Sequence, residues 1–398
     1  MLDSILGKRD FMKWTKRGEE LESLYQIALQ NVRTKKKAII YGYSREGRSF
    51  ADMLKCIGDV KILAYVDRRY NEFAEDRTGI PIISPECLDD YVDEDTFIYI
   101  AIQYYTVDDV IIALSNRGYT EWYDFLVIHK LRMLREMVEN DFLMIPLIEI
   151  PITEKCTLNC KKCSFFTPYY KQPQNFKLED VVLWLDEVFA KAGYIETLRF
   201  VGGEPFLYPS FYEVLCYVKE KYISKIGRIV ILTNATIVPN EKTLELIGSY
   251  PRARIGITDY THVVNYKEKL EMFKDKLHQY NIDYWCDADK TWFDLKFPEE
   301  KIPATNVRKV FDDCSHHCRT LCDHKLFWCS FNASAHRANL IDSKINSDYI
   351  NIVDATKNEI LEFIWGYSEL GYNDLCRWCK RAEYISIDSG EQVTRKDI

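Results

Sequence analysis

The sequence predicts an α/β fold, in which buried strands alternate with amphipathic helices. Short apolar runs typical of buried parallel strands recur along the chain, with helix-period segments between them. The predicted strands of the central region are Leu143 to Ile152, Ile195 to Val201, Arg228 to Thr233 and Ala253 to Thr258. Between the first two, Val182, Leu185 and Phe189 repeat with a helical period. Polar residues follow the carboxyl ends of these strands, where (βα) barrels place their functional groups.

Changes in this pattern divide the chain into four expected parts. They are an amino-terminal helical segment (1–35), a small doubly wound α/β domain (36–130), a larger α/β domain (143–300) and a cysteine-rich region (301–398). The chain has 398 residues, of which 47% are hydrophobic. It is therefore long enough for about two or three domains with sizeable cores.

Composition narrows the classes of partner and compartment. The formal net charge is -8, so no basic surface indicates a nucleic-acid partner. Charged residues interrupt the amino terminus where a signal peptide would need an apolar core, and no apolar run is long enough to span a membrane. We expect a cytoplasmic protein, in which thirteen cysteines indicate metal or thiol chemistry more than disulfides.

Three cysteines follow the first central strand closely. Cys156, Cys160 and Cys163 form a CxxxCxxC array on one short loop. Three thiolates at this spacing can hold three irons of a [4Fe-4S] cluster, which leaves the fourth iron open to a small molecule. A structural zinc site is the alternative, but such a site needs four protein ligands.

This loop, followed by Gly-Gly-Glu-Pro after the next strand, is the signature of the radical SAM enzymes, which the sequence resembles over about residues 146 to 290. The resemblance implies a partial six-stranded (βα) barrel of the TIM type. It also implies that S-adenosylmethionine (SAM) chelates the open iron and is cleaved by one electron to a 5'-deoxyadenosyl radical. The electron donor expected for such an enzyme is a flavodoxin or a ferredoxin. The expected SAM contacts are Gly202, Gly203, Glu204, Pro205, Asn234 and Thr258.

The carboxyl-terminal cysteines resemble the twitch subdomain of radical SAM enzymes, a shortened relative of the SPASM domain. The resemblance implies a second, auxiliary [4Fe-4S] cluster. Its expected ligands are Cys314, Cys329, Cys376 and Cys379. Cys318 competes with Cys314 as the first ligand. A zinc site built from the same residues is the alternative, because four thiolates suit zinc equally well.

The small amino-terminal domain begins with a βαβ pattern. A strand at Lys37 to Tyr41 leads into a Gly-x-Ser-x-x-Gly turn, and the next strand, Val60 to Val66, ends at an acidic residue. The further strands predicted in this domain are Ile80 to Ile83, Thr96 to Ile102 and Trp122 to Ile128. This order resembles Rossmann-like nucleotide or sugar-nucleotide modules of glycan biosynthesis proteins. The candidate nucleotide contacts are Gly42, Ser44, Gly47 and Asp67. A docking or scaffold domain with an empty crevice is the alternative.

The short auxiliary region resembles those of an aminocyclitol dehydrogenase and of sugar-ring epimerases. We therefore expect a sugar or nucleotide sugar as substrate and epimerisation of a ring carbon as the reaction. An epimerase needs a hydrogen donor, and Cys286, at the end of the strand-like stretch Ile282 to Trp285, is the candidate. A buried packing thiol is the alternative for Cys286. A sugar or aminocyclitol dehydrogenase, which needs no donor thiol, and a SPASM-type peptide maturase are the alternative functions.

Overall fold

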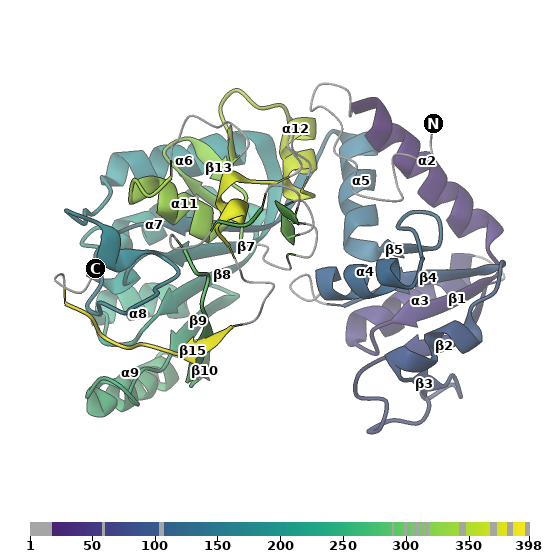
Figure 1. Cartoon of the computed structure of the whole chain (residues 1–398), viewed down its shortest axis with the longest axis horizontal. Helices are drawn as coiled ribbons and strands as arrows, with labels where there is room; N and C mark the ends of the chain where they lie inside the picture. The colour runs from purple at the N-terminus through teal and green to yellow at the C-terminus, as the bar shows by residue number, and fades with distance from the viewer. Residues whose placement is uncertain are drawn as a thin grey trace. The chain divides into compact units, whose positions relative to one another are not determined.

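In the computed structural model the chain divides into two units, Met1–Phe142 and Leu143–Ile398 (Figure 1). The structure describes residues 18–57, 60–102, 107–288, 290–297, 301–303, 306–307, 310–311, 314, 318–341, 348–366, 372–379 and 385–394. In this part of the chain, no helix has the length and apolar character needed to cross a membrane.

The first unit is a parallel five-stranded sheet with the order β3-β2-β1-β4-β5. Its strands are β1 (Lys37–Tyr41), β2 (Lys61–Val66), β3 (Ile82–Ile83), β4 (Thr96–Ile100) and β5 (Phe125–Val127). Its helices are α2 (Gly18–Thr34), α3 (Arg45–Ile57), α4 (Val107–Asn116) and α5 (Ile128–Asn140). Helix α2 packs on α5 and buries Leu24, Tyr25 and Ala28. The predicted strands of this region are thus present.

The second unit contains an eight-stranded sheet with the order β10-β9-β8-β7-β6-β12-β13-β14. The parallel strands are β6 (Leu143–Pro151), β7 (Ala192–Val201), β8 (Ile226–Thr233), β9 (Ala253–Thr258) and β10 (Asp283–Asp287). The helices that connect them in turn are α6 (Leu178–Lys191), α7 (Phe211–Lys221), α8 (Glu241–Gly248) and α9 (Lys267–Gln279). This alternation brings the carboxyl ends of β6 to β9 to one edge of the sheet.

The carboxyl-terminal region extends the same sheet from its β6 edge. Strand β12 (Thr320–Cys322) pairs in parallel with β6, and β13 (Lys325–Phe327) and β14 (Tyr349–Asn351) continue antiparallel. Two helices, α11 (Ser330–Arg337) and α12 (Lys357–Ile364), follow these strands. A separate pair joins β11 (Thr291–Phe293) to β15 (Ser386–Asp388). The cysteine-rich region is therefore built onto the first strand of the central region.

The two faces of the central sheet differ in polarity. Phe200 of β7 contacts the ring of Phe211 in α7, with centroids 5.5 Å apart, so this face packs on the helices. Side chains alternate between faces along a strand, which turns the neighbouring Arg199 to the opposite face. There Arg199 Nη1 donates to Glu149 Oε1 of β6 at 2.8 Å, and Glu149 is 2% exposed. A buried ion pair thus lies inside strands that their sequence marks as apolar.

Candidate active site

A cavity of about 260 Å³ lies at the carboxyl ends of β6 to β9. The cysteine loop after β6 forms one wall, and the ends of β7, β8 and β9 form the others. The predicted site residues that line it are Cys156, Cys160, Cys163, Gly202, Gly203, Asn234 and Thr258. Residues from four separate stretches of sequence therefore meet at one place.

The glycine pair allows the end of β7 to lie against the cysteine loop. The Gly203 amide donates to Thr153 O at 2.9 Å, and the Glu204 amide donates to Lys155 O at 2.8 Å. A Cβ at Gly203 would come within 2.3 Å of Lys155 O and 2.9 Å of the Cys156 Cβ. Any larger residue would displace the loop that carries the first thiol, so the need for glycine here is steric.

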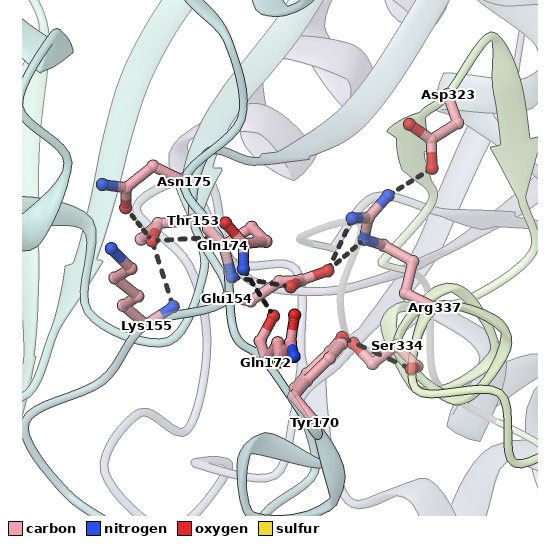
Figure 2. Close-up of polar contacts among 10 residues, drawn as sticks. All are labelled: Thr153, Glu154, Lys155, Tyr170, Gln172, Gln174, Asn175, Asp323, Ser334 and Arg337. Atoms are coloured by element: carbon pink, nitrogen blue, oxygen red, sulfur yellow. Dashed lines mark hydrogen bonds and ion pairs between the residues drawn. The ribbon is translucent and has the colours of Figure 1, made fainter.

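Thr153 fixes the start of the same loop (Figure 2). Its hydroxyl donates to Asn175 Oδ1 at 2.7 Å and accepts the Lys155 amide at 3.0 Å. Because Thr153 is 1% exposed, these bonds form in a buried setting. The direction in which the chain leaves β6 is therefore set before the first cysteine.

The Glu204 carboxylate points to the end of β8 and not into the cavity. The Thr233 hydroxyl lies 2.8 and 2.9 Å from its two oxygens, and the Asn234 amide donates to it at 2.8 Å. Burial raises the pKa of Glu204 to about 7, although these hydrogen bonds oppose the shift. Glu204 therefore orients Asn234, which lines the cavity. Pro205 opens the short 3₁₀ helix Pro205–Leu207 and is buried.

Glu204 makes the stability of the protein depend on pH. The pKa of this carboxyl group is about 7 in the folded protein and 4.5 ordinarily, so its contribution to stability is complete below about pH 4.5 and disappears as the pH rises through 7. We expect the free energy of unfolding to fall by up to about 3 kcal/mol between about pH 5 and about pH 8. Glu204→Gln should flatten this slope in chemical denaturation, whereas Glu213→Gln, on the exposed side of α7, should keep it. An unchanged slope in Glu204→Gln would contradict this origin.

The thiols of the loop accept hydrogen bonds from several elements. The Leu158 amide and Asn234 Nδ2 each donate to Cys156 Sγ at 3.4 Å, and Gln392 Nε2 donates to Cys160 Sγ at 3.1 Å. Burial raises the pKa of Cys156 and of Cys160 to about 12. Metal binding deprotonates such thiols, and N–H donors to sulfur then stabilise the thiolates.

The arrangement of these thiols suits a cluster better than a single ion. Among the described residues, no three His, Cys, Asp or Glu side chains are grouped so that they could hold one metal ion. A tetrahedral zinc ion would need its thiolates about 2.3 Å from one point. The three thiols instead line one wall of the cavity, and three thiolates are the protein ligands of a [4Fe-4S] cluster with one open corner.

A segment near the end of the chain lies along the cysteine loop. We call residues 391–393 the strap. The Lys161 amide donates to Glu391 O at 2.6 Å, and the Val393 amide donates to Asn159 O at 2.9 Å. The Asn159 amide also donates to Gln392 Oε1 at 2.7 Å. The sequence carries no signal for this contact, because it joins residues that are far apart in the chain.

Three aromatic side chains, Phe165, Tyr260 and Trp292, complete the cavity wall. The rings of Tyr260 and Trp292 meet edge to face, with centroids 5.7 Å apart. Burial raises the pKa of Tyr260, so its hydroxyl stays neutral. Aromatic faces of this kind suit a planar ring such as adenine. Sequence reasoning did not assign Phe165 or Tyr260, because neither belongs to a motif.

The structure brings Cys314, Cys329, Cys376 and Cys379 close to one another. Burial raises the pKa of Cys329 and of Cys376, and the neighbouring thiols of the group raise both further. The Asn332 amide donates to Cys329 Sγ at 3.4 Å. Cys318 lies elsewhere, because its Sγ accepts Arg199 Nη1 at 3.5 Å beside Glu149. Cys329 is buried and the other three thiols are half-buried. Four neighbouring thiols are the ligand type of an auxiliary cluster or a zinc ion, although no three of these described side chains are grouped around a single metal position.

Cys286 does not line the cavity. A Cβ at Gly256 would come within 2.6 Å of Leu232 and 2.4 Å of Trp285, so these two side chains lie on the same face of the sheet. Leu232 lines the cavity, and this face is therefore the one that the cavity occupies. Cys286 follows Trp285 on β10 and so faces the other way. Its charged neighbours include Lys274 of α9, and burial raises the pKa of Cys286. The predicted donor thus lies on the helix-covered side of the sheet.

The predicted nucleotide contacts of the first unit form one tight turn after β1. Ser44 Oγ donates to Ala101 O at 3.2 Å and accepts the Gly47 amide at 3.0 Å. Asp67 accepts the Tyr43 amide and the Arg69 amide, each at 2.9 Å. A Cβ at Gly42 would come within 2.6 Å of Ala101 O, and one at Gly47 within 2.1 Å of Gly42 O. Each of these four residues therefore shapes the turn itself.

The solved structures that the chain matches share little sequence with it. "Native anSMEcpe with bound AdoMet and Cp18Cys peptide" is 15% identical, with a TM-score of 0.40 over 61% of this chain and 87% of that chain. "Crystal structure of BtrN in complex with AdoMet and 2-DOIA" is 16% identical, with a TM-score of 0.39 over 63% and 98%. "Crystal structure of Streptococcus suis SuiB" is 16% identical, with a TM-score of 0.29 over 47% and 41%.

Comparison with protein families gives a match within the second unit. No curated protein matches the chain. The family described as "Radical SAM superfamily" matches residues 150–288, which hold the three cysteines of the loop, the glycine pair and strands β7 to β10. Residues 150–288 are therefore similar to the radical SAM superfamily.

Proposed function

We propose that this protein is a radical SAM enzyme that oxidises a carbohydrate, a sugar or a nucleotide sugar. The cavity at the carboxyl ends of β6 to β9 carries this proposal, because three thiols meet a glycine pair and two strand ends there. When bound, a [4Fe-4S] cluster and SAM supply one-electron cleavage of the sulfonium and abstraction of a substrate hydrogen. A flavodoxin or ferredoxin is the proposed electron donor.

The residues of the cavity have distinct proposed roles. Cys156, Cys160 and Cys163 hold three irons and leave one corner open. The backbone at Gly202 and Gly203 can approach the amino acid part of SAM closely, because neither residue has a side chain. Asn234, which Glu204 holds in place, and Thr258 offer polar groups from the next two strands. The aromatic side chains of the wall exclude water from the ring of the cofactor.

Oxidation also needs a place for an electron to go. A secondary alcohol that becomes a ketone loses one hydrogen atom to the cofactor fragment, then one proton and one electron. The group formed by Cys314, Cys329, Cys376 and Cys379 is the proposed site of a second [4Fe-4S] cluster, which is reduced by that electron. Cys329 is buried and Cys376 is half-buried, and burial raises the pKa of both thiols, so the group lies in a setting of reduced polarity, which is one of the features that tune such clusters.

Epimerisation, the reaction expected from the sequence, has less support from the geometry. An epimerase must return a hydrogen atom to the substrate from a donor such as a thiol. The cysteines that line the cavity among the described residues are those assigned to the cluster, and Cys286 faces α9. A peptide maturase is a third possibility, which the parallel α/β sheet of the first unit does not favour, because peptide clasps are winged helices.

A deuterium experiment distinguishes these reactions. Reduced enzyme and SAM should be incubated in deuterated water with nucleotide sugars, free sugars and short peptides. We expect a sugar product that has lost two hydrogens and gained no deuterium at carbon, read by mass spectrometry. One deuterium gained with inversion would show an epimerase, and a modified peptide would show a maturase. Either of these two results would overturn the proposed oxidation.

A further inference from the structure

A large hollow lies outside the cavity, between the segment that follows the cysteine loop and the end of α11. Its volume is about 830 Å³. The polar and aromatic residues that line it are Glu154, Tyr169, Tyr170, Lys171, Gln172, Arg337 and Asn339. A hollow of this size is in the range of small-molecule sites, which combine aromatic surface with a few polar groups. None of these residues belongs to a motif of the sequence.

A narrow void lies between this hollow and the cavity. It holds about 20 Å³ and shares Glu154, Tyr170 and Arg337 with the hollow. Four of its lining residues also line the cavity: Phe165, Thr167, Gly202 and Gly203. The three spaces therefore follow one another from the hollow to the glycine pair. The hollow is thus a place from which one part of a substrate can extend toward the cofactor.

Arg337 lines both the hollow and the narrow void, and Figure 2 shows its polar contacts. Its Nε and Nη2 donate to Glu154 Oε1 at 2.9 and 2.5 Å, and its Nη1 donates to Asp323. The guanidinium also lies 4.1 Å from the centre of the Phe176 ring. Three of the five N–H groups of arginine are used in this way. Stacking and the buried Glu154, which is 8% exposed, hold the group in one orientation.

The balance of charge at the hollow favours an anion. Its charged lining residues are two cations, Lys171 and Arg337, and one carboxylate, Glu154. Glu154 is already engaged, since it also accepts the Gln174 amide at 2.9 Å. Asp323 is 51% exposed, so a ligand can replace it at Arg337 without leaving a buried charge unpaired. The protein as a whole carries a net charge of -8, which makes a positive hollow distinctive.

We propose that Arg337 and Lys171 bind an anionic group of the substrate, a phosphate or a carboxylate, and that this group replaces Asp323 at Arg337. This inference rests on the proposed function and names the chemical class of its substrate. The rest of the substrate then extends past Tyr170 toward the glycine pair. The narrow void has room for about one water molecule. The Tyr170 side chain must therefore move before the substrate can pass through it. Tyr170 is held there by a long hydrogen bond, from its hydroxyl to Ser334 O at 3.4 Å.

Calorimetric titration of the anaerobic holoprotein with SAM tests this inference. The probes are a nucleoside diphosphate sugar, a sugar 1-phosphate, a uronic acid and the parent neutral sugar. We expect the anionic probes to bind at least about tenfold more tightly than the neutral sugar, since hydrogen bonds to charged groups are strong. The phosphate and carboxylate probes separate the two sources of charge.

Substitutions at these residues should change the affinity for the anionic probes in opposite directions. Lys171→Met and Arg337→Lys should weaken anion binding by about tenfold or more. Asp323→Asn should tighten it, because the competing carboxylate is removed. Lys177→Met, an exposed lysine outside the hollow, is the matched control and should bind as the wild type does. Lys171 and Asp323 are exposed side chains, so their variants keep the test valid even if Arg337→Lys folds poorly.

The outcomes separate this inference from the function on which it rests. Equal binding of the neutral and anionic probes, or unchanged binding in Lys171→Met and Asp323→Asn, would overturn the anion site. Reductive cleavage of SAM by the wild type, measured in the same preparation, reports on the radical SAM assignment by itself. Intact cleavage without preference for anions would therefore remove the anion site alone.

Discussion

Cys156→Ala is expected to abolish reductive cleavage of SAM. Cys156 is one of three thiols at the cavity, and two thiolates cannot hold a cubane with one open corner. Wild-type protein reconstituted without air should contain about eight irons, and the variant about four. Iron analysis and the yield of 5'-deoxyadenosine after chemical reduction measure both effects.

Cys216→Ala is the matched control, because Cys216 lies on α7 and does not line the cavity. It should keep the full iron content and the full yield of 5'-deoxyadenosine. Continued formation of 5'-deoxyadenosine by Cys156→Ala would defeat the assignment of the loop. A zinc ion in place of iron in the wild type would do the same.

Cys376→Ala is expected to separate the two halves of the reaction. The variant should lose the second cluster and again contain about four irons. It should still cleave SAM, because the three thiols of the loop remain, but it should form no ketone product, since the electron has no acceptor. Electron paramagnetic resonance of the reduced variant should show the cluster of the loop alone, with a signal that changes when SAM is added.

Cys318→Ala and Cys314→Ala decide which cysteine is the first ligand of this cluster. Cys318 contacts Arg199, so its removal should leave about eight irons. Cys314→Ala should leave about four. The reverse result would make Cys318 the ligand. If the wild type instead holds about four irons and one zinc ion, the four cysteines form a zinc site and not a cluster.

Most strands of the fold could be predicted from apolar runs, and their ends differ for local reasons. Ala253–Thr258 is β9 as predicted. The strand predicted at Trp122 to Ile128 is shorter, because Trp122 has a φ of 77° and Ile128 already begins α5. The strand predicted at Ile80 to Ile83 covers only β3, since Pro81 lacks the N–H that a ladder needs. Local composition thus predicts the element but not its limits.

Contacts between distant segments could not be predicted in the same way. The three-residue strand β12 is too short for a periodic signal, yet its pairing with β6 attaches the whole cysteine-rich region. Glu149 and Arg199 read as interruptions of apolar runs until the register places them opposite each other. The face of the sheet to which the Cys286 side chain points depends on the strand register, because a shift of one residue moves a side chain to the opposite face. For the cavity, motif spacing predicted the residues that meet, but not the aromatic wall.

The strap has a consequence for the order in which the protein matures. Gln392 is 232 positions beyond Cys160, and it donates to that sulfur. A ribosome therefore makes the three cysteines long before it makes the residue that donates to one of them. We infer that iron bound during translation meets a loop without this N–H donor, whereas iron bound by the finished chain meets a loop whose Cys160 sulfur already accepts it.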